Sequence, residues 1–102
     1  MNDLLDSRAT EVAVLCRRLH VRELDAFGSA VTGNFDPGSS DLDFLVDFEP
    51  LPPAEYAEAY FSLKEGLESI FGRPVDLISS SSVVNPYFRE SVEASRRRMY
   101  AA

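Results

Sequence analysis

The segment DLDFLVDF, residues 41–48, constrains the fold more than any other part of the chain. Successive side chains of a β-strand point to opposite faces of the sheet. Alternation through this segment gives one apolar face, made of Leu42, Phe44, Val46 and Phe48. The other face carries Asp41, Asp43, Leu45 and Asp47. The segment therefore predicts a half-buried strand with an acidic side.

Apolar patterns elsewhere in the chain predict the elements that accompany this strand. The expected elements are a helix over about residues 2–20, strands over 22–27, 42–48 and 73–78, a helix from Pro53 to a C-cap at Gly72, and a last helix from Pro86 whose inward positions include Phe88, Val92 and Met99. Their order is α-β-β-α-β-α. The predicted fold class is α/β (α+β), with a small three-stranded sheet covered by helices in a single domain, residues 1–102.

The charge of the chain limits the partners that it can bind. Its 17 acidic and 10 basic residues give a net charge of −7. That is the wrong sign for binding a long nucleic acid, because phosphate backbones are held by Lys and Arg. The one dense basic cluster, Arg96–Arg98, is expected in the last turn of the final helix, where the helix dipole favours cations.

The sequence contains features typical of a cytoplasmic protein. No apolar run approaches the roughly 18 residues that a membrane-spanning helix needs, and residues 1–10 lack the pattern of a signal peptide. Cys16, the only cysteine, is expected to be a buried and unreactive thiol on the apolar face of the first helix. His20, the only histidine, is expected at the end of that helix or on the surface.

Asp41, Asp43 and Asp76 are candidate metal ligands. Taken alone, the aspartates of residues 41–47 could be the solvated side of a strand. However, Asp is disfavoured in strands, and Asp76 interrupts an otherwise apolar one, PVDLI. If the two strands are neighbours, three carboxylates meet on one side of the sheet and repel one another unless a cation neutralises them. Such hard oxygen ligands favour Mg²⁺, or Mn²⁺, over zinc.

Gly28 and Ser29 are candidate phosphate-binding residues. They follow the first strand and begin a turn-rich connection, SAVTGNFDPGSS. A glycine lets the backbone approach a ligand closely, and Ser29 offers a hydroxyl and an N–H to a phosphate oxygen. Gly-Ser behind one strand and Asp-x-Asp at the start of the next would hold a triphosphate between hydrogen-bond donors and two metal ions. Such a site suits in-line displacement at phosphorus.

The segments GSAVTGNFDPGSSDLD and RPVDLI resemble the signature of the nucleotidyltransferase superfamily that includes DNA polymerase β. The brevity and order of the elements resemble the minimal nucleotidyltransferases, the MntA-like group, over nearly all 102 residues. The resemblance implies that Gly28 and Ser29 bind the triphosphate and that Asp41, Asp43 and Asp76 hold two Mg²⁺ ions, with Asp76 on the catalytic one. Thr32 stands where many relatives carry an arginine.

The same resemblance implies an enzyme that transfers AMP from ATP to a hydroxyl of a partner protein, as the antitoxin of a HEPN-type toxin. Two alternatives stay open. One is a non-catalytic module that neutralises the toxin by contact, which the absence of an arginine at Thr32 favours. The other is a nucleotide-sensing subunit. We also expect a partner to cover an exposed apolar patch made of Tyr87, Phe88, Met99 and Tyr100.

Overall fold

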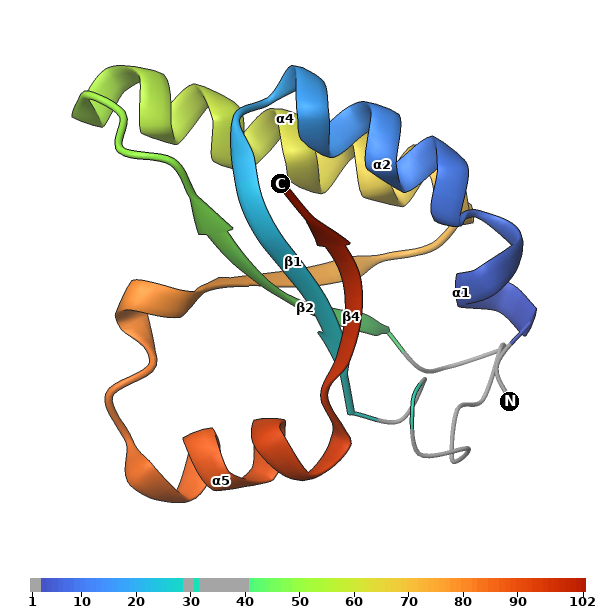
Figure 1. Ribbon diagram of the computed structural model, residues 1–102, viewed down its shortest axis with the longest axis vertical. Helices are drawn as coiled ribbons and strands as arrows, with labels where there is room; N and C mark the ends of the chain where they lie inside the picture. Colours follow the sequence, from blue (N-terminus) through green and yellow to red (C-terminus); the bar gives the residue numbers. More distant parts are fainter. Residues whose placement is uncertain (1–2, 29–30, 32–40) are drawn as a thin grey trace.

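The computed structural model of the protein describes residues 3–28, 31 and 41–102. Apart from Val31, the turn-rich connection before Asp41, Ser29 and Thr32 included, lies outside the described residues. The elements are α1 (Asp3–Ser7), α2 (Ala9–Arg18), β1 (Val21–Phe27), β2 (Leu42–Phe48), α4 (Pro53–Phe71), β3 (Val75–Ser79), the 3-10 helix η1 (Ser80–Ser82), α5 (Pro86–Ser95) and β4 (Arg97–Ala101). The predicted α/β class is confirmed (Figure 1).

The described strands form one four-stranded sheet in the order β3-β2-β1-β4. β1 is antiparallel to both β2 and β4, whereas β2 and β3 are parallel. The long helix α4 connects the two parallel strands, as a parallel connection requires. α4 begins at Pro53 and ends at Gly72, whose φ of 67° gives the left-handed C-cap that the sequence predicted.

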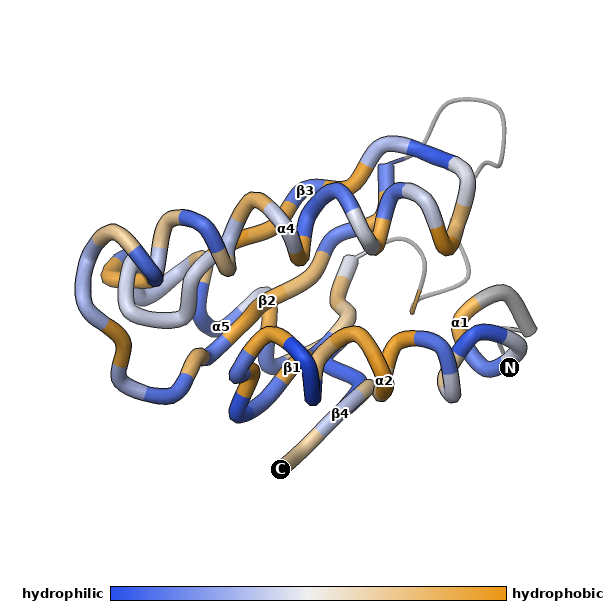
Figure 2. Tube along the Cα trace, turned by 90° about the horizontal axis from the view of Figure 1, so that it is seen from above, coloured by the Kyte–Doolittle hydropathy of each residue, from blue (hydrophilic) through white to orange (hydrophobic). Residues whose placement is uncertain are grey.

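One face of the sheet carries most of the apolar core. α2 and α4 cover this face and lie together in the upper part of Figure 1. Leu42, Phe44 and Val46 of β2 meet Leu63 and Leu67 of α4 in this core, and all five side chains are buried. Figure 2 shows apolar residues recurring along both helices, interrupted by polar ones. The apolar side predicted for residues 42–48 is therefore the core side of the sheet.

The opposite face is covered in part by α5, which lies at the far end of the molecule from α2 and α4 (Figure 1). A smaller apolar cluster joins this helix to the sheet, and it contains Phe27, Leu45, Val83 and Val92. Asn85 caps the helix, because its side chain accepts hydrogen bonds from the backbone N–H groups of Tyr87 and Phe88. The acidic side of β2 therefore belongs to the face that α5 only partly covers.

The predicted strand count was wrong, because the sheet has a fourth strand. The last helix ends at Ser95, and Arg97–Ala101 forms β4 beside β1. Arg96–Arg98 therefore do not lie in a last helical turn, and Met99 is not an inward helix position. The physical reason is a buried carboxylate in β1, Asp25, which binds both Arg96 and Arg98. These ion pairs and the free edge of β1 outweigh the helical preference of this segment.

Two further boundaries differ from those predicted. The first helix is interrupted at Arg8, so that residues 2–20 give two helices rather than one. The third strand is Val75–Ser79, two residues later at its start than expected. His20 follows α2 in a left-handed conformation, with φ of 62°, and so lies at the helix end as expected.

Candidate active site

Asp43 and Asp76 lie side by side on two neighbouring strands. They are register partners in the parallel pairing of β2 with β3, so both side chains lie on the same face of the sheet. The flanking residues Val75 and Leu77 are buried on the core side, which leaves Asp76 exposed on the other side. The parallel pairing thus brings together two of the three predicted metal ligands, 33 positions apart in the sequence.

Asp41 lies two residues before Asp43, immediately ahead of β2, and is exposed. The pKa of Asp43 is raised above its ordinary value, first by burial and then by the negative charges of Asp76 and Asp41. Because both neighbouring carboxylates disfavour ionisation of Asp43, the three acidic groups form one electrostatically coupled cluster. A bound cation would reverse this effect.

Gly28 lies directly against Asp43. Phe27, the last residue of β1, is the register partner of Asp43, and Gly28 follows it with φ of 77°. A Cβ atom on Gly28 would lie 2.6 Å from Oδ2 of Asp43, which is closer than two such atoms can approach. The left-handed backbone conformation therefore favours glycine strongly, and a larger residue would also have to displace the Asp43 carboxylate. Ser29, the other predicted phosphate ligand, lies outside the described residues.

The chemistry of this cluster fits a divalent cation, although its geometry is open. Across residues 3–28, 31 and 41–102, no three His, Cys, Asp or Glu side chains are grouped closely enough to enclose a metal ion. The donors present are carboxylate oxygens, the ligand type that Mg²⁺ and Mn²⁺ prefer. Mg²⁺ usually binds through one or two carboxylates and completes its shell with water and phosphate oxygens. An open cluster whose acidic groups repel one another is therefore consistent with such an ion.

A separate charged cluster on this face was not predicted from the sequence. Asp25 of β1 has only 2% of its surface exposed. Nε of Arg96 and Nε of Arg98 each lie 2.6 Å from one of its carboxylate oxygens. The available signal was Asp25 itself, which interrupts the apolar run LDAF as Asp76 interrupts PVDLI. The three clustered arginines near the C-terminus were the second part of the signal, because a buried carboxylate needs cationic partners.

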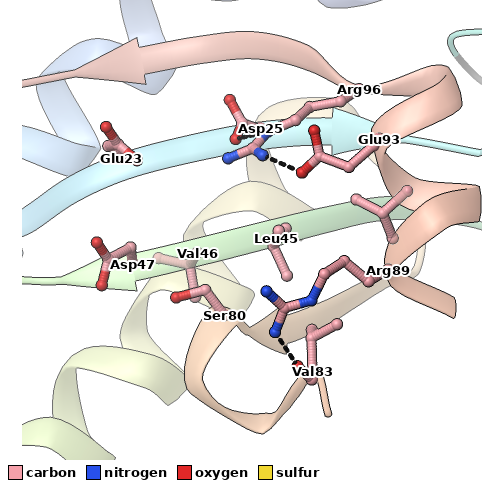
Figure 3. A pocket seen from close by; sticks show the side chains of 11 residues that line it. Glu23, Asp25, Leu45, Val46, Asp47, Ser80, Val83, Arg89, Glu93 and Arg96 are labelled. Carbon is pink, nitrogen blue, oxygen red and sulfur yellow. Dashed lines mark hydrogen bonds and ion pairs between the residues drawn. The ribbon is translucent and has the colours of Figure 1, made fainter. Parts of the chain in front are cut away.

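A pocket of about 260 Å³ lies between α5 and this charged part of the sheet (Figure 3). Its walls include Asp25, Leu45, Asp47, Arg89, Glu93 and Arg96. In Figure 3 the guanidinium group of Arg89 points toward Val83, whose carbonyl oxygen it binds, and Arg96 reaches Glu93. Along β2 the buried Leu45 separates Asp43 from Asp47. The pocket is therefore next to the acidic cluster but does not contain its carboxylates.

Comparison with known proteins identifies the class to which this fold and site belong. A model of the nucleotidyltransferase domain matches residues 12–99. The chain therefore belongs to the nucleotidyltransferase domain family and is a nucleotidyltransferase, as the Gly-Ser and Asp-x-Asp segments indicated. Enzymes of this family generally use divalent metal ions.

Two relatives place the chain more closely within that family. The protein adenylyltransferase MntA of Thermococcus cleftensis is 42% identical over 69 residues, which are 68% of this chain and 66% of MntA. A protein of Methanocaldococcus jannaschii that carries the provisional name protein adenylyltransferase is 36% identical over 80 residues, 78% of each chain. The relatives are thus named for the transfer of AMP to proteins.

Solved structures agree with this assignment. A structure provisionally named as a minimal nucleotidyltransferase has a TM-score of 0.68 and 30% identity, and the similarity covers 95% of both chains. A toxin-antitoxin structure with AMP-PNP has a TM-score of 0.69 at 21% identity over 92% of this chain and 73% of the other, and it supports the fold. Among the residues that the structure describes, no helix has the length and apolar character needed to cross a membrane.

Proposed function

We propose that this chain is a protein adenylyltransferase that transfers AMP from ATP to a hydroxyl group of a partner protein, as the antitoxin of a toxin-antitoxin pair. The observation that carries the proposal is the register pairing of Asp43 with Asp76 beside the bare backbone of Gly28. In the reaction, the acceptor hydroxyl loses its proton to solvent and its oxygen bonds to the α-phosphorus of ATP. The bond from this phosphorus to the oxygen that bridges it to the β-phosphate breaks, and the β- and γ-phosphates leave as pyrophosphate.

The residues of this chain divide into two groups in this proposal. Asp41, Asp43 and Asp76 hold two Mg²⁺ ions. Gly28 and Ser29 bind the triphosphate, since a glycine without a side chain leaves room for phosphate oxygens next to Asp43. When bound, the ions lower the pKa of the attacking hydroxyl and neutralise the leaving pyrophosphate.

The acceptor is proposed to be a protein of the HEPN toxin class. One solved neighbour is a tri-AMPylated HEPN toxin of Shewanella oneidensis in complex with an MNT antitoxin, with a TM-score of 0.64 and 19% identity. In addition, Tyr87, in the first turn of α5, and Val84, just before that helix, are 82% and 83% exposed. Of the four residues predicted to form an apolar patch, however, only Tyr87 is largely exposed. Phe88, Met99 and Tyr100 pack partly against the core clusters.

The test is transfer of AMP to the protein encoded beside this one, in the presence of ATP and Mg²⁺. Mass spectrometry of that protein should show an added AMP with the wild-type enzyme. The substitution Asp76→Asn should reduce transfer by at least 100-fold, because it removes a charged ligand without changing the shape of the side chain. The matched control is Asp47→Asn, an aspartate on the same strand face as Asp43 that is paired with Arg22 instead. This control should retain wild-type transfer.

One sequence observation favours a second function, that of a binding module without catalysis. The resemblance to the nucleotidyltransferase family implies an arginine in many relatives where this chain has Thr32, which leaves the connection after Gly28 without that cation. The same experiment separates the two functions. If the wild type neutralises the toxin without modifying it, and Asp76→Asn neutralises it equally well, the enzyme proposal is wrong and the binding module is correct.

A further inference from the structure

The last residue of α5 contacts the glycine of the candidate active site. The backbone N–H of Gly28 donates a hydrogen bond of 3.0 Å to Oγ of Ser95, which lies 67 positions later in the sequence. The Ser95 hydroxyl in turn makes a long contact of 3.4 Å to the carbonyl oxygen of Ser91, one helical turn earlier. Because the hydroxyl proton points to Ser91, a lone pair of Ser95 is directed at Gly28. The contact joins two elements whose backbones do not otherwise pair.

This hydrogen bond restrains the orientation of the Gly28 backbone relative to Asp43. The amide of Gly28 is taken up by Ser95, while its bare Cα lies against the Asp43 carboxylate. A glycine with positive φ has a wide choice of conformations, because it carries no side chain to restrict it. The Ser95 acceptor therefore supplies a restraint that the residue itself lacks. Without it, the N–H of Gly28 loses its partner, and the turn keeps the hydrogen bond of 3.1 Å that the Gly28 carbonyl oxygen accepts from the N–H of Val31.

Ser95 is itself held in place by the charged cluster on β1. The next residue, Arg96, binds Asp25 and Glu93, each at 2.6 Å. Arg98 binds the second oxygen of Asp25, also at 2.6 Å. Since Asp25 is buried, separating these groups would leave a carboxylate without its partners. The side chains of the segment from Ser95 to Arg98 thus bind Asp25 of β1 and Gly28 just after it, in addition to the strand pairing of Arg97 and Arg98 with β1.

We propose that Ser95 is a positioning residue for nucleoside triphosphate binding, which holds the Gly28 turn so that its bare backbone faces Asp43 and the phosphates. This inference rests on the proposed nucleotidyltransferase site. In this inference Gly28 leaves room for the phosphates, because it has no side chain, and forms a fixed turn. Its N–H stays bonded to Ser95 of α5 and does not bind phosphate. Residues far from the Gly-Ser signature then influence affinity for the nucleotide.

The test compares Ser95→Ala with Ser95→Thr, which keeps the hydroxyl. The dissociation constants of ATP and of inorganic tripolyphosphate are measured by calorimetry in the presence of Mn²⁺, at a temperature at which circular dichroism shows every variant folded. Ser95→Ala should weaken both ligands by about 5- to 10-fold, the loss expected for one hydrogen bond. Ser95→Thr should stay within 2-fold of wild type. Ser91→Ala is the matched control, because the hydrogen bond there uses only the backbone carbonyl of Ser91.

A second readout does not depend on ligands. Amide hydrogen exchange of Gly28 should be slow in the wild type and in Ser95→Thr, and faster in Ser95→Ala. If Ser95→Ala binds both ligands as tightly as wild type, or if Ser95→Thr is as weak as Ser95→Ala, the positioning role is wrong. Failure of the wild type to bind ATP or tripolyphosphate would instead overturn the proposed function. The two failures are therefore distinguishable.

Discussion

Asp43 is the acidic residue of the candidate site whose ionisation is disturbed most clearly. Burial and the charges of Asp76 and Asp41 raise its pKa above the ordinary value of 3.8. Between that value and the raised one, the folded protein keeps a proton that the unfolded chain has released. Stability therefore falls as the pH rises through this window, and at neutral pH the ionised Asp43 destabilises the metal-free fold. This is the energetic cost of placing the three carboxylates of the proposed cation site close together.

The substitution Asp43→Asn should accordingly stabilise the metal-free protein at neutral pH. Urea denaturation in EDTA, at several values between pH 3.5 and pH 7, should show a gain that shrinks as the pH falls, since wild-type Asp43 becomes protonated there. Asp47→Asn is the control, because Arg22 pairs with that carboxylate and the gain should be absent.

The same charge should be needed for metal binding. Calorimetric titration with Mn²⁺ should show at least a 10-fold weaker affinity for the double variant Asp41→Asn, Asp43→Asn than for wild type. Equal affinity, or a loss of stability of Asp43→Asn in EDTA, would remove these residues from the metal site.

Among the elements, β4 and α5 depend on one buried carboxylate in β1. Asp25 receives both Arg96 and Arg98 and thereby fixes the junction between the helix and the edge strand. Removal of one member of a buried ion pair costs about 3–5 kcal/mol. The guanidinium side chains here are 31% and 46% exposed and can regain water. The cost should therefore lie below that range.

We expect Asp25→Asn to lower the free energy of unfolding by about 2–3 kcal/mol. Chemical denaturation monitored by circular dichroism measures this value. Asp47→Asn again serves as the comparison, because an exposed ion pair such as Arg22–Asp47 contributes at most about 1 kcal/mol. An effect of Asp25→Asn no larger than that of Asp47→Asn would contradict the proposed dependence of β4 on this carboxylate.

The apolar core encloses Cys16, so the chemical reactivity of this thiol can be used to follow unfolding of the molecule. Its side chain has no exposed surface, and burial raises the pKa of the thiol to about 12. The expectation of a buried thiol is confirmed. Only the thiolate reacts readily with electrophiles, so the folded protein should be almost inert at neutral pH.

Labelling of Cys16 by iodoacetamide should therefore require global unfolding. The logarithm of the labelling rate should rise linearly with urea concentration. Its slope should match the slope by which urea lowers the free energy of unfolding. Addition of ATP and Mn²⁺ should slow labelling, because ligands that bind only the folded state stabilise it. A labelling rate independent of low urea concentrations would mean that α2 opens locally, and that the core does not unfold as a unit.

Local sequence patterns were sufficient for the elements whose faces differ sharply in polarity. The alternation of residues 42–48 predicted β2 with its boundaries, and Pro53 with Gly72 predicted the ends of α4. Asp76 could be assigned to the face opposite Val75 and Leu77, because a strand has a period of two residues. These patterns predicted that Asp43 and Asp76 lie on one side of the sheet if their two strands are neighbours. Their register pairing agrees with it.

The C-terminal part was decided by contacts between residues far apart in the sequence. Nothing local distinguishes Arg97–Ala101 from the end of a helix, because the choice depends on Asp25 and on the free edge of β1, more than 70 positions earlier. The hydrogen bond from Gly28 to Ser95 is equally non-local. Local periodicity shows which side chains of a segment face solvent and which face the core. Pairing across the sheet depends instead on which charged side chains and backbone groups the folded chain brings together.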